Sequence, residues 1–262
     1  MTKSPFYTPT SSCKLDGTTL IIPAVSIGSV PQLAVDLLLH DASLSLVKVG
    51  RIDPSFCFPF VGPSETEDAY DITTSLEVFC NGSVTVIQQR SPVYKSLNSS
   101  YICALIDWIT TSHFKEVLWL TSIDAAARTD DEFCTPILSL LPANSTPSTR
   151  ILASLQTSFP QFNPPSIQSL QIPTKTHIDV PHIPGSLLTR KLLHHISHSS
   201  VKDSFGALLY FAAEGDTRPD AHNLATLVVS LLSTTTTPQL LLKEPRSWSA
   251  LFGRPAASAL YA

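Results

Sequence analysis

The chain has 262 residues and a mass of 28.4 kDa, with 43 % hydrophobic residues and a mean hydropathy of +0.17. Charged residues make up only 15 %, against about 25 % in typical soluble proteins. The net charge of −4 has the wrong sign for binding phosphate backbones, so we expect no nucleic-acid partner. The apolar excess predicts a large core, a surface that a partner covers, or both.

The cysteines and the first residues bear on the cellular compartment. The five cysteines are odd in number, widely spaced and without a CxxC motif, which favours a reducing compartment over a disulfide framework or a zinc site; they are Cys13, Cys57, Cys80, Cys103 and Cys134. Residues 1–10 hold no apolar signal-peptide core, and no stretch approaches the roughly 18 apolar residues of a membrane span. We therefore expect a cytoplasmic and nuclear protein with no membrane contact.

The first part of the chain predicts a strand, a helix and a second strand. Residues 19–25 (TLIIPAV) form a short apolar run that is typical of a buried strand. Apolar residues recur at helical spacing over residues 30–40, and Ser29 with Gln32 three residues later predicts a capping box at the helix start. Residues 44–52 predict the second strand.

A β-hairpin is predicted next. Residues 76–80 and 83–88 flank the dipeptide Asn81-Gly82. This dipeptide favours a type I′ turn, in which both central residues need positive φ. The sequence therefore predicts two antiparallel strands joined by that turn.

The second half of the chain predicts a similar alternation around a proline-rich region. Helices are predicted over residues 101–113, 187–198 and 220–232, and buried strands over residues 117–120 and 205–213. Residues 136–184 hold nine of the 21 prolines, which predicts loops with one short element near residues 151–155. The order of elements predicts a single α/β domain over residues 15–245, with a mixed, largely parallel sheet flanked by helices.

Two serines are the candidate nucleophiles. Ser26 lies in the loop Ser26-Ile27-Gly28-Ser29 between a predicted strand and a helix start, where backbone N–H groups can also hold an anion. Ser122 follows the VLWL strand, with Asp124 beside it, and His113 and the later histidines are the candidate bases. A capped strand-to-helix junction explains the first loop equally well, and the chain has no GxSxG nucleophile motif. An α/β hydrolase- or phosphorylase-like enzyme using Ser26 or Ser122 is thus the alternative hypothesis.

Metal and cation sites have weaker candidates. His194 and His198 lie one helical turn apart, with His195 between them, but at about 100° per residue they fall opposite the apolar stripe of their helix. A solvated polar face is the simpler interpretation. Glu214 and Asp216 precede the last long helix, where the helix dipole favours acidic residues without any cation. We therefore expect no metal and no cofactor.

The C-terminal segment, residues 246–262, combines an aromatic cluster with a tail. Trp248, Leu251 and Phe252 predict a last short helix that packs against the domain. The residues that follow are small, which predicts a flexible tail ending in Leu260-Tyr261-Ala262.

Three segments together resemble one family. They are residues 20–38 (LIIPAVSIGSVPQLAVDLL), residues 211–221 with the acidic turn Glu214-Gly215-Asp216, and residues 247–253 (SWSALFG). In this order they resemble the proteasome assembly chaperone 2 family. The resemblance implies an α/β fold related to nucleoside phosphorylases that is used without catalysis. It also implies a heterodimer with proteasome assembly chaperone 1 that binds α subunits of the 20S proteasome and promotes α-ring formation.

The tail matches the family's hydrophobic-tyrosine-any-residue motif at Leu260, Tyr261 and Ala262. The resemblance implies that the first two side chains fill a pocket between adjacent α subunits, while the terminal carboxylate pairs with a pocket lysine. Burial of one such side chain contributes about 1.5 to 3 kcal/mol, and ordering each tail residue costs about 1 to 2 kcal/mol. One tail is therefore weak alone, and a second tail on the partner raises avidity by about 10² to 10⁴.

The two hypotheses predict different surfaces. A chaperone needs an accessible tail and an apolar face for its partner, whereas an enzyme needs a pocket where a nucleophile and a base converge. For the chaperone, we expect the apolar excess to gather on one face of the domain and in the tail.

Overall fold

The computed structural model describes residues 4–64, 72–163, 180, 182–233 and 242–251. The predicted tail motif Leu260-Tyr261-Ala262 and the aromatic residue Phe252 lie outside the described residues. No helix in the described part of the chain is both long and apolar enough to cross a membrane.

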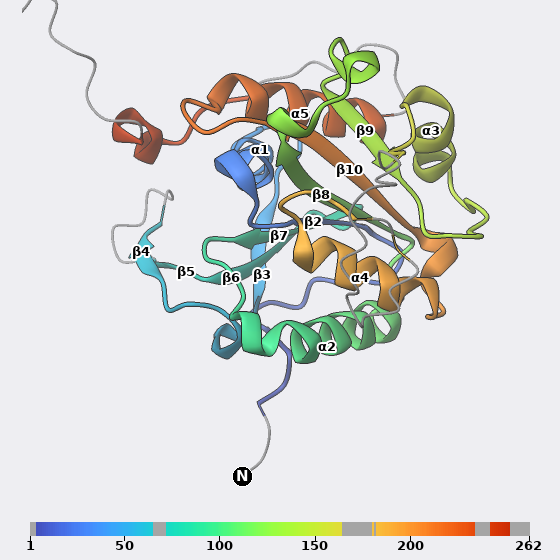
Figure 1. Ribbon diagram of the computed structural model, residues 1–262. Helices are drawn as coiled ribbons and strands as arrows, with labels where there is room; N and C mark the ends of the chain where they lie inside the picture. Colours follow the sequence, from blue (N-terminus) through green and yellow to red (C-terminus); the bar gives the residue numbers. More distant parts are fainter. Residues whose placement is uncertain (1–3, 65–71, 164–179, 181, 234–241, 252–262) are drawn as a thin grey trace, which may run out of the picture.

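Eight strands form one sheet in the order β1-β3-β6-β7-β2-β8-β10-β9 (Figure 1). Their bounds are β1 Tyr7–Pro9, β2 Thr19–Pro23, β3 Val47–Ile52, β6 Leu76–Cys80, β7 Val84–Gln89, β8 Glu116–Asp124, β9 Ile137–Leu140 and β10 Phe205–Ala212. The four central strands, β7, β2, β8 and β10, run parallel. Antiparallel strands extend the sheet at both edges.

Helices cover both faces of this sheet. One face carries α1 (Val30–Leu39), α3 (Arg150–Ser158) and α5 (Arg218–Leu232), and the other carries α2 (Asn98–Thr111) and α4 (Leu187–Ser197) (Figure 1). Short 3-10 turns join these elements at Ile27–Ser29, Pro54–Phe56, Lys95–Leu97, Ala125–Ala127, Asp130–Glu132, Lys202–Ser204 and Arg246–Ala250. The predicted α/β architecture, a mixed and largely parallel sheet flanked by helices, is confirmed.

The sheet separates two hydrophobic clusters. The cluster beneath α2 and α4 contains the largest fully buried side chains, among them Trp119, Tyr101 and Phe205. The indole Nε1 of Trp119 donates to Oγ1 of Thr189 at 3.0 Å, so the one polar atom of this ring is satisfied in the core. The second cluster lies between the sheet and α1, α3 and α5. Burial on both faces explains why the central strands read as continuous apolar runs.

Two local predictions are wrong in detail. The helix α1 starts where expected, but Ser29 has a φ of 52° and makes no side-chain cap hydrogen bond. Gln32 instead donates from Nε2 to the carbonyl of Gln89 at 3.0 Å, so a tertiary contact replaces the capping box.

At the confirmed hairpin, Gly82 has a φ of 87° while Asn81 is not in the left-handed region. The Asn81 side chain accepts from the backbone N–H groups of Ser83 and Val84, which favours a turn with a single left-handed residue.

The described part of the proline-rich region holds one more regular element than predicted. The expected element near residues 151–155 is the nine-residue helix α3, and the Thr149 hydroxyl caps it. Residues 137–140 form β9, which pairs with β10 at the sheet edge. Pro136 and Pro142 lie outside this strand, where their missing N–H groups remove no ladder hydrogen bond.

The last described segment packs against the domain through Trp248 alone of the two described residues in the predicted cluster. The turn Arg246–Ala250 places Trp248 in the cluster beneath α1 and α5, where it is 3 % exposed. Its ring meets the imidazole of His222 on α5 edge to face at a centroid distance of 6.4 Å. Leu251 follows as an exposed residue. Trp248 therefore fastens the chain to the domain just before residues 252–262 begin.

Candidate interaction surface

The two candidate nucleophiles are brought together by the fold. The hydroxyls of Ser26 and Ser122 lie 2.8 Å apart, and the Ser122 N–H donates to Oγ of Ser26 at 2.9 Å. The Ser122 hydroxyl also donates to the carbonyl of Ile27. His113, the first of the candidate bases, precedes β8, whereas Ser122 lies near the end of that nine-residue strand. The serine pair therefore joins the loop before α1 to β8, and His113 is not placed to act on it.

The candidate anion loop packs against another turn of the protein. Gly28 has a φ of 67°, and its carbonyl accepts from the Thr217 hydroxyl at 2.6 Å. A Cβ at Gly28 would meet Cγ2 of Thr217 at 2.8 Å, so glycine is required by conformation and by contact. Glu214 lines the small cavity beside this loop. A carboxylate at that position disfavours an anionic ligand.

The histidine and acidic candidates have structural roles. The rings of His194 and His198 are 5.2 Å apart, and no three metal-ligating side chains converge anywhere in the described ranges. Burial, and then the neighbouring histidines, lower the pKa of His195. The carboxylate of Asp216 accepts from Nε of Arg218 at 2.9 Å, and this hydrogen bonding lowers its pKa. In the acidic turn, the candidate cation site, Asp216 is thus paired with Arg218.

Exposed apolar side chains gather at one end of the molecule. Among the described residues, five of the eight exposed large hydrophobic side chains lie between residues 47 and 72; they are Val47, Phe58, Phe60, Val61 and Ile72. The last four belong to, or directly precede, a two-stranded ribbon of β4 (Val61–Pro63) and β5 (Ile72–Thr74). We call Phe58, Phe60, Val61 and Ile72 the ribbon surface. Figure 1 shows this ribbon beyond the edge of the main sheet.

Hydrogen bonds from residues just outside β6 and β7 hold the segment that leads into the ribbon. The carbonyl of Phe58 accepts from the hydroxyls of Ser75 and Ser91, at 3.0 and 2.6 Å. The Phe58 ring packs against the ring of Tyr94 with centroids 4.2 Å apart. The ribbon surface is therefore attached at its base while Val61, 71 % exposed, faces solvent.

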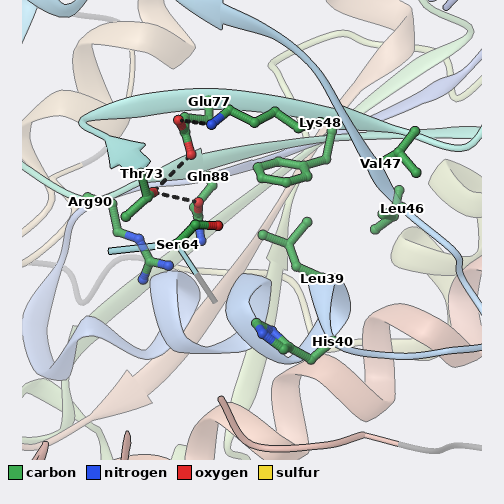
Figure 2. A pocket seen from close by; sticks show the side chains of 11 residues that line it. Leu39, His40, Leu46, Val47, Lys48, Ser64, Thr73, Glu77, Gln88 and Arg90 are labelled. Carbon is green, nitrogen blue, oxygen red and sulfur yellow. Dashed lines mark hydrogen bonds and ion pairs between the residues drawn. The ribbon is translucent and has the colours of Figure 1, made fainter. Parts of the chain in front are cut away.

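A cavity of about 420 Å³ lies between the ribbon and α1. Figure 2 shows Leu39 and His40, at the end of α1, across the cavity from Lys48 and Glu77. Its lining side chains come from the end of α1, from β3, β6 and β7, and from the ribbon; they are Leu39, His40, Leu46, Val47, Lys48, Ser64, Thr73, Glu77, Phe79, Gln88 and Arg90. The cavity therefore extends the ribbon surface toward the end of α1.

Two buried carboxylates hold the polar side chains of the cavity wall: Glu77 lines the cavity, and Asp36 lies behind it and pairs with the lining residue Arg90. Glu77 accepts from Nζ of Lys48 at 2.7 Å and from the Thr73 hydroxyl at 2.9 Å, as Figure 2 shows. Asp36 on α1 accepts from Nη1 of Arg90 at 2.7 Å and from Nε2 of Gln88 at 2.8 Å. Each carboxylate accepts hydrogen bonds from several donors, one of which is a cationic side chain. Their charges are neutralised in place, which leaves the apolar side chains as the main feature of this surface.

Sequence reasoning missed the ribbon surface for a physical reason. Strands β4 and β5 have three residues each, and a proline and a glycine stand in β4. Such short segments show no two-residue alternation of apolar and polar side chains. The signal that was available is the run Phe56 to Phe60, where three phenylalanines fall within five residues of a region that otherwise predicts loops.

Known proteins match this chain along most of its length. The sequence profile of the PAC2 family matches residues 20–241. The chain is 32 % identical over 260 residues to proteasome assembly chaperone 2 of Xenopus laevis, covering 93 % of this chain and 94 % of that one. It is 29 % identical over 267 residues to proteasome assembly chaperone 2 of Homo sapiens, covering 96 % and 97 %.

Solved structures share the fold at low sequence identity. Pyrococcus furiosus PbaA, described as an archaeal homolog of proteasome-assembly chaperone, superposes with a TM-score of 0.62 at 14 % identity, covering 89 % of this chain and 88 % of PbaA. PbaB of the same organism, described as an archaeal proteasome activator, gives a TM-score of 0.56 at 10 % identity, covering 89 % and 92 %. The profile match and the similarity to the vertebrate proteins, together with this fold, place the chain in the PAC2 family.

Proposed function

We propose that this chain is a non-enzymatic chaperone of 20S proteasome assembly. In this proposal it forms a heterodimer with proteasome assembly chaperone 1, binds α subunits and promotes formation of the α ring. The observation that carries the proposal is the similarity to proteasome assembly chaperone 2 of Xenopus laevis over 93 % of the chain. The same cellular role implies a cytoplasmic and nuclear location, which stays a prediction.

The ribbon surface is our candidate for the heterodimer face. It gathers exposed aromatic and branched side chains beside a cavity of about 420 Å³. Aromatic side chains next to a pocket are typical of the central contacts of protein interfaces. The sequence predicts an apolar face for a partner, and this surface supports that prediction.

The tail is our candidate for α-subunit binding, through Leu260, Tyr261 and Ala262. The residue before the tail, Leu251, lies near the start of α1, where it lines a cavity of about 240 Å³ together with Ser29 and Leu33. The eleven residues 252–262 span at most about 36 to 40 Å when fully extended. This length is sufficient for the tail to enter a pocket on a neighbouring protein, as the proposal requires.

The hydrogen bonds of Ser26 and Ser122 support a structural role for both side chains, which is consistent with a non-enzymatic protein. Ser122 is 1 % exposed, and the hydroxyls of Ser26 and Ser122 are engaged with each other and with backbone carbonyls. A catalytic serine needs a base within hydrogen-bond reach of its hydroxyl. The strand end of β8 therefore offers no nucleophile ready to react.

Co-expression tests this function directly. The chain, tagged at its N-terminus so that residues 260–262 stay unmodified, is expressed with proteasome assembly chaperone 1 and the 20S α subunits of one species. We expect affinity purification to recover a one-to-one complex of the two chaperones with α subunits bound. Recovery of the tagged chain alone, at concentrations where the chaperone 2 of that species binds both, contradicts the proposal.

A further inference from the structure

Two cysteines that are far apart in the sequence meet beside the β6–β7 hairpin. Cys13 precedes β2, and Cys80 is the last residue of β6. Their sulfur atoms lie 3.9 and 4.0 Å from the same atom, the carbonyl oxygen of Lys14. The Gly82 N–H donates to Sγ of Cys80 at 3.2 Å. The two thiols therefore converge on one short stretch of backbone.

The remaining cysteines differ from this pair. Cys57 is buried, and Cys103 and Cys134 are exposed on other elements. Cys80 is fully buried, whereas Cys13 is partly exposed. The Cys13 thiol is thus open to a small oxidant, while the Cys80 thiol is shielded from solvent.

We propose that Cys13 and Cys80 are a disulfide-forming pair, which a peroxide converts into a covalent link between the N-terminal segment and the β6–β7 hairpin. The Cys13 thiolate attacks a peroxide oxygen, which gives a sulfenic acid at Cys13 and a hydroxide; this hydroxide takes up the proton that the thiol lost and becomes one water. The Cys80 sulfur then attacks the Cys13 sulfur, and the hydroxyl leaves as a second water. Two thiols and one hydrogen peroxide yield one disulfide and two waters.

The link closes a loop that contains most of the candidate interaction surface. Residues 14–79 include α1, β3 and the ribbon surface. A cross-link between residues far apart in the sequence restricts the unfolded chain more than the folded one. We therefore expect oxidation to raise the thermal midpoint by about 5 to 15 °C.

The environment of Cys13 sets the pH dependence of the reaction. The hydrogen bond with Cys80, followed by burial, raises the pKa of Cys13 to about 11. The titratable groups beside it are Cys80 and the Tyr7 phenol of β1, while the adjacent Lys14 ammonium pairs with Asp16 at 3.1 Å. Since the thiolate reacts, the rate of disulfide formation rises about tenfold per pH unit between pH 7 and pH 10.

Peptide mapping of the full chain tests the pair. The protein is oxidised with excess hydrogen peroxide at pH 8.5, alkylated under denaturing conditions and digested with trypsin and a glutamate-specific protease. The second protease is needed because residues 52–90 form one tryptic peptide that holds both Cys57 and Cys80. We expect a linked peptide joining Cys13 to Cys80, and a thermal midpoint that returns to its original value with a reducing agent.

Matched variants separate this pair from the other thiols. The double variant Cys103→Ser and Cys134→Ser keeps the linked peptide and the thermal shift, because these side chains lie elsewhere. The variant Cys13→Ser loses both, and its reduced form keeps the thermal midpoint of the reduced wild type. Cys13 and Cys80 both alkylated after oxidation, or Cys13 linked to another cysteine, overturns the proposal. If the rate of disulfide formation does not change between pH 7 and pH 10, Cys13 is not the residue that attacks the peroxide.

Discussion

The ammonium of Lys48 lies 2.7 Å from Oε1 of Glu77, and the Glu77 side chain is only 2 % exposed. Lys48 also donates to the carbonyl of Ile72 at 3.0 Å, and Glu77 accepts from the Thr73 and Thr74 hydroxyls. This pair therefore connects β5 of the ribbon to β3 and β6 of the main sheet. One buried carboxylate thus contributes to the attachment of the ribbon, in addition to the contacts of Phe58 at its base.

Replacing that carboxylate should destabilise the protein. Glu77→Ala removes the acceptor of Lys48 and of two threonine hydroxyls, so we expect the free energy of unfolding to fall by about 2 to 4 kcal/mol in urea titrations. The control is Lys14→Ala, which removes the exposed pair of Lys14 with Asp16. Exposed pairs contribute about 0 to 1 kcal/mol. Equal losses in the two variants would show that Glu77 does not hold the ribbon.

The ribbon surface should bind the partner chaperone through its apolar side chains. Val61→Lys exchanges a side chain that is 71 % exposed in the free chain, so the monomer keeps its stability to within about 0.5 kcal/mol. If the partner buries this side chain, binding weakens about 10- to 100-fold, because burial contributes about 1.5 to 3 kcal/mol. Titration calorimetry with proteasome assembly chaperone 1 gives the dissociation constant.

The matched control for this prediction is Phe133→Lys. Phe133 is 73 % exposed and lies outside the ribbon surface, so the same new charge should leave the dissociation constant unchanged. Weakening by Phe133→Lys but not by Val61→Lys would move the heterodimer face to the turn at Asp130–Glu132.

Alanine substitutions at Gly28 and Gly17 should distinguish the energetic cost of a steric clash from the cost of a positive φ. Gly28→Ala forces alanine into a φ of 67° and places its Cβ 2.8 Å from Cγ2 of Thr217. Gly17→Ala imposes a similar conformation, with a φ of 77°, but its Cβ meets no atom within 4 Å. We expect Gly17→Ala to cost about 1 kcal/mol and Gly28→Ala about 1 to 3 kcal/mol more, measured by chemical unfolding. If both variants lost the same free energy of unfolding, the contact between the loop before α1 and the β10–α5 turn would be able to adjust to the added methyl group without cost.

The serine pair should behave as one structural unit. In a double-mutant cycle of Ser26→Ala and Ser122→Ala, we expect a coupling free energy of about 0.5 to 1.5 kcal/mol, because the two hydroxyls bond each other. Binding of α subunits should persist in both single variants. An ester-hydrolysis activity that only Ser122→Ala abolishes would instead favour the enzyme hypothesis.

The sequence predicts the central layers of the fold well and the edges poorly. Strands β2, β8 and β10 are buried on both faces, so their apolar runs are long and clear. The edge strand β9 has four residues between two prolines, and the ribbon strands have three residues each. Short edge strands gain their stability from pairing with neighbours that are distant in the sequence, and no local pattern reports those neighbours.

The candidate sites show the same limit. Ser26 and Ser122 are recognisable as hydroxyls at strand ends, but their mutual hydrogen bond depends on β2 and β8 being adjacent in the sheet. Gln32 matches a capping box in the sequence, yet the carbonyl of Gln89 lies within its reach once α1 packs on β7. Local motifs therefore identify which residues make these hydrogen bonds, but the partners of those residues depend on the tertiary fold.

The most direct test of the chaperone account is the α-subunit binding of a chain that lacks residues 260–262, measured together with its binding to proteasome assembly chaperone 1. The account assigns the tail to the α ring and the folded domain to the partner. It predicts that the deletion weakens α-subunit binding at least about tenfold while the dissociation constant of the heterodimer stays unchanged. Loss of the heterodimer, or α-subunit binding equal to that of the intact chain, would contradict this division between domain and tail.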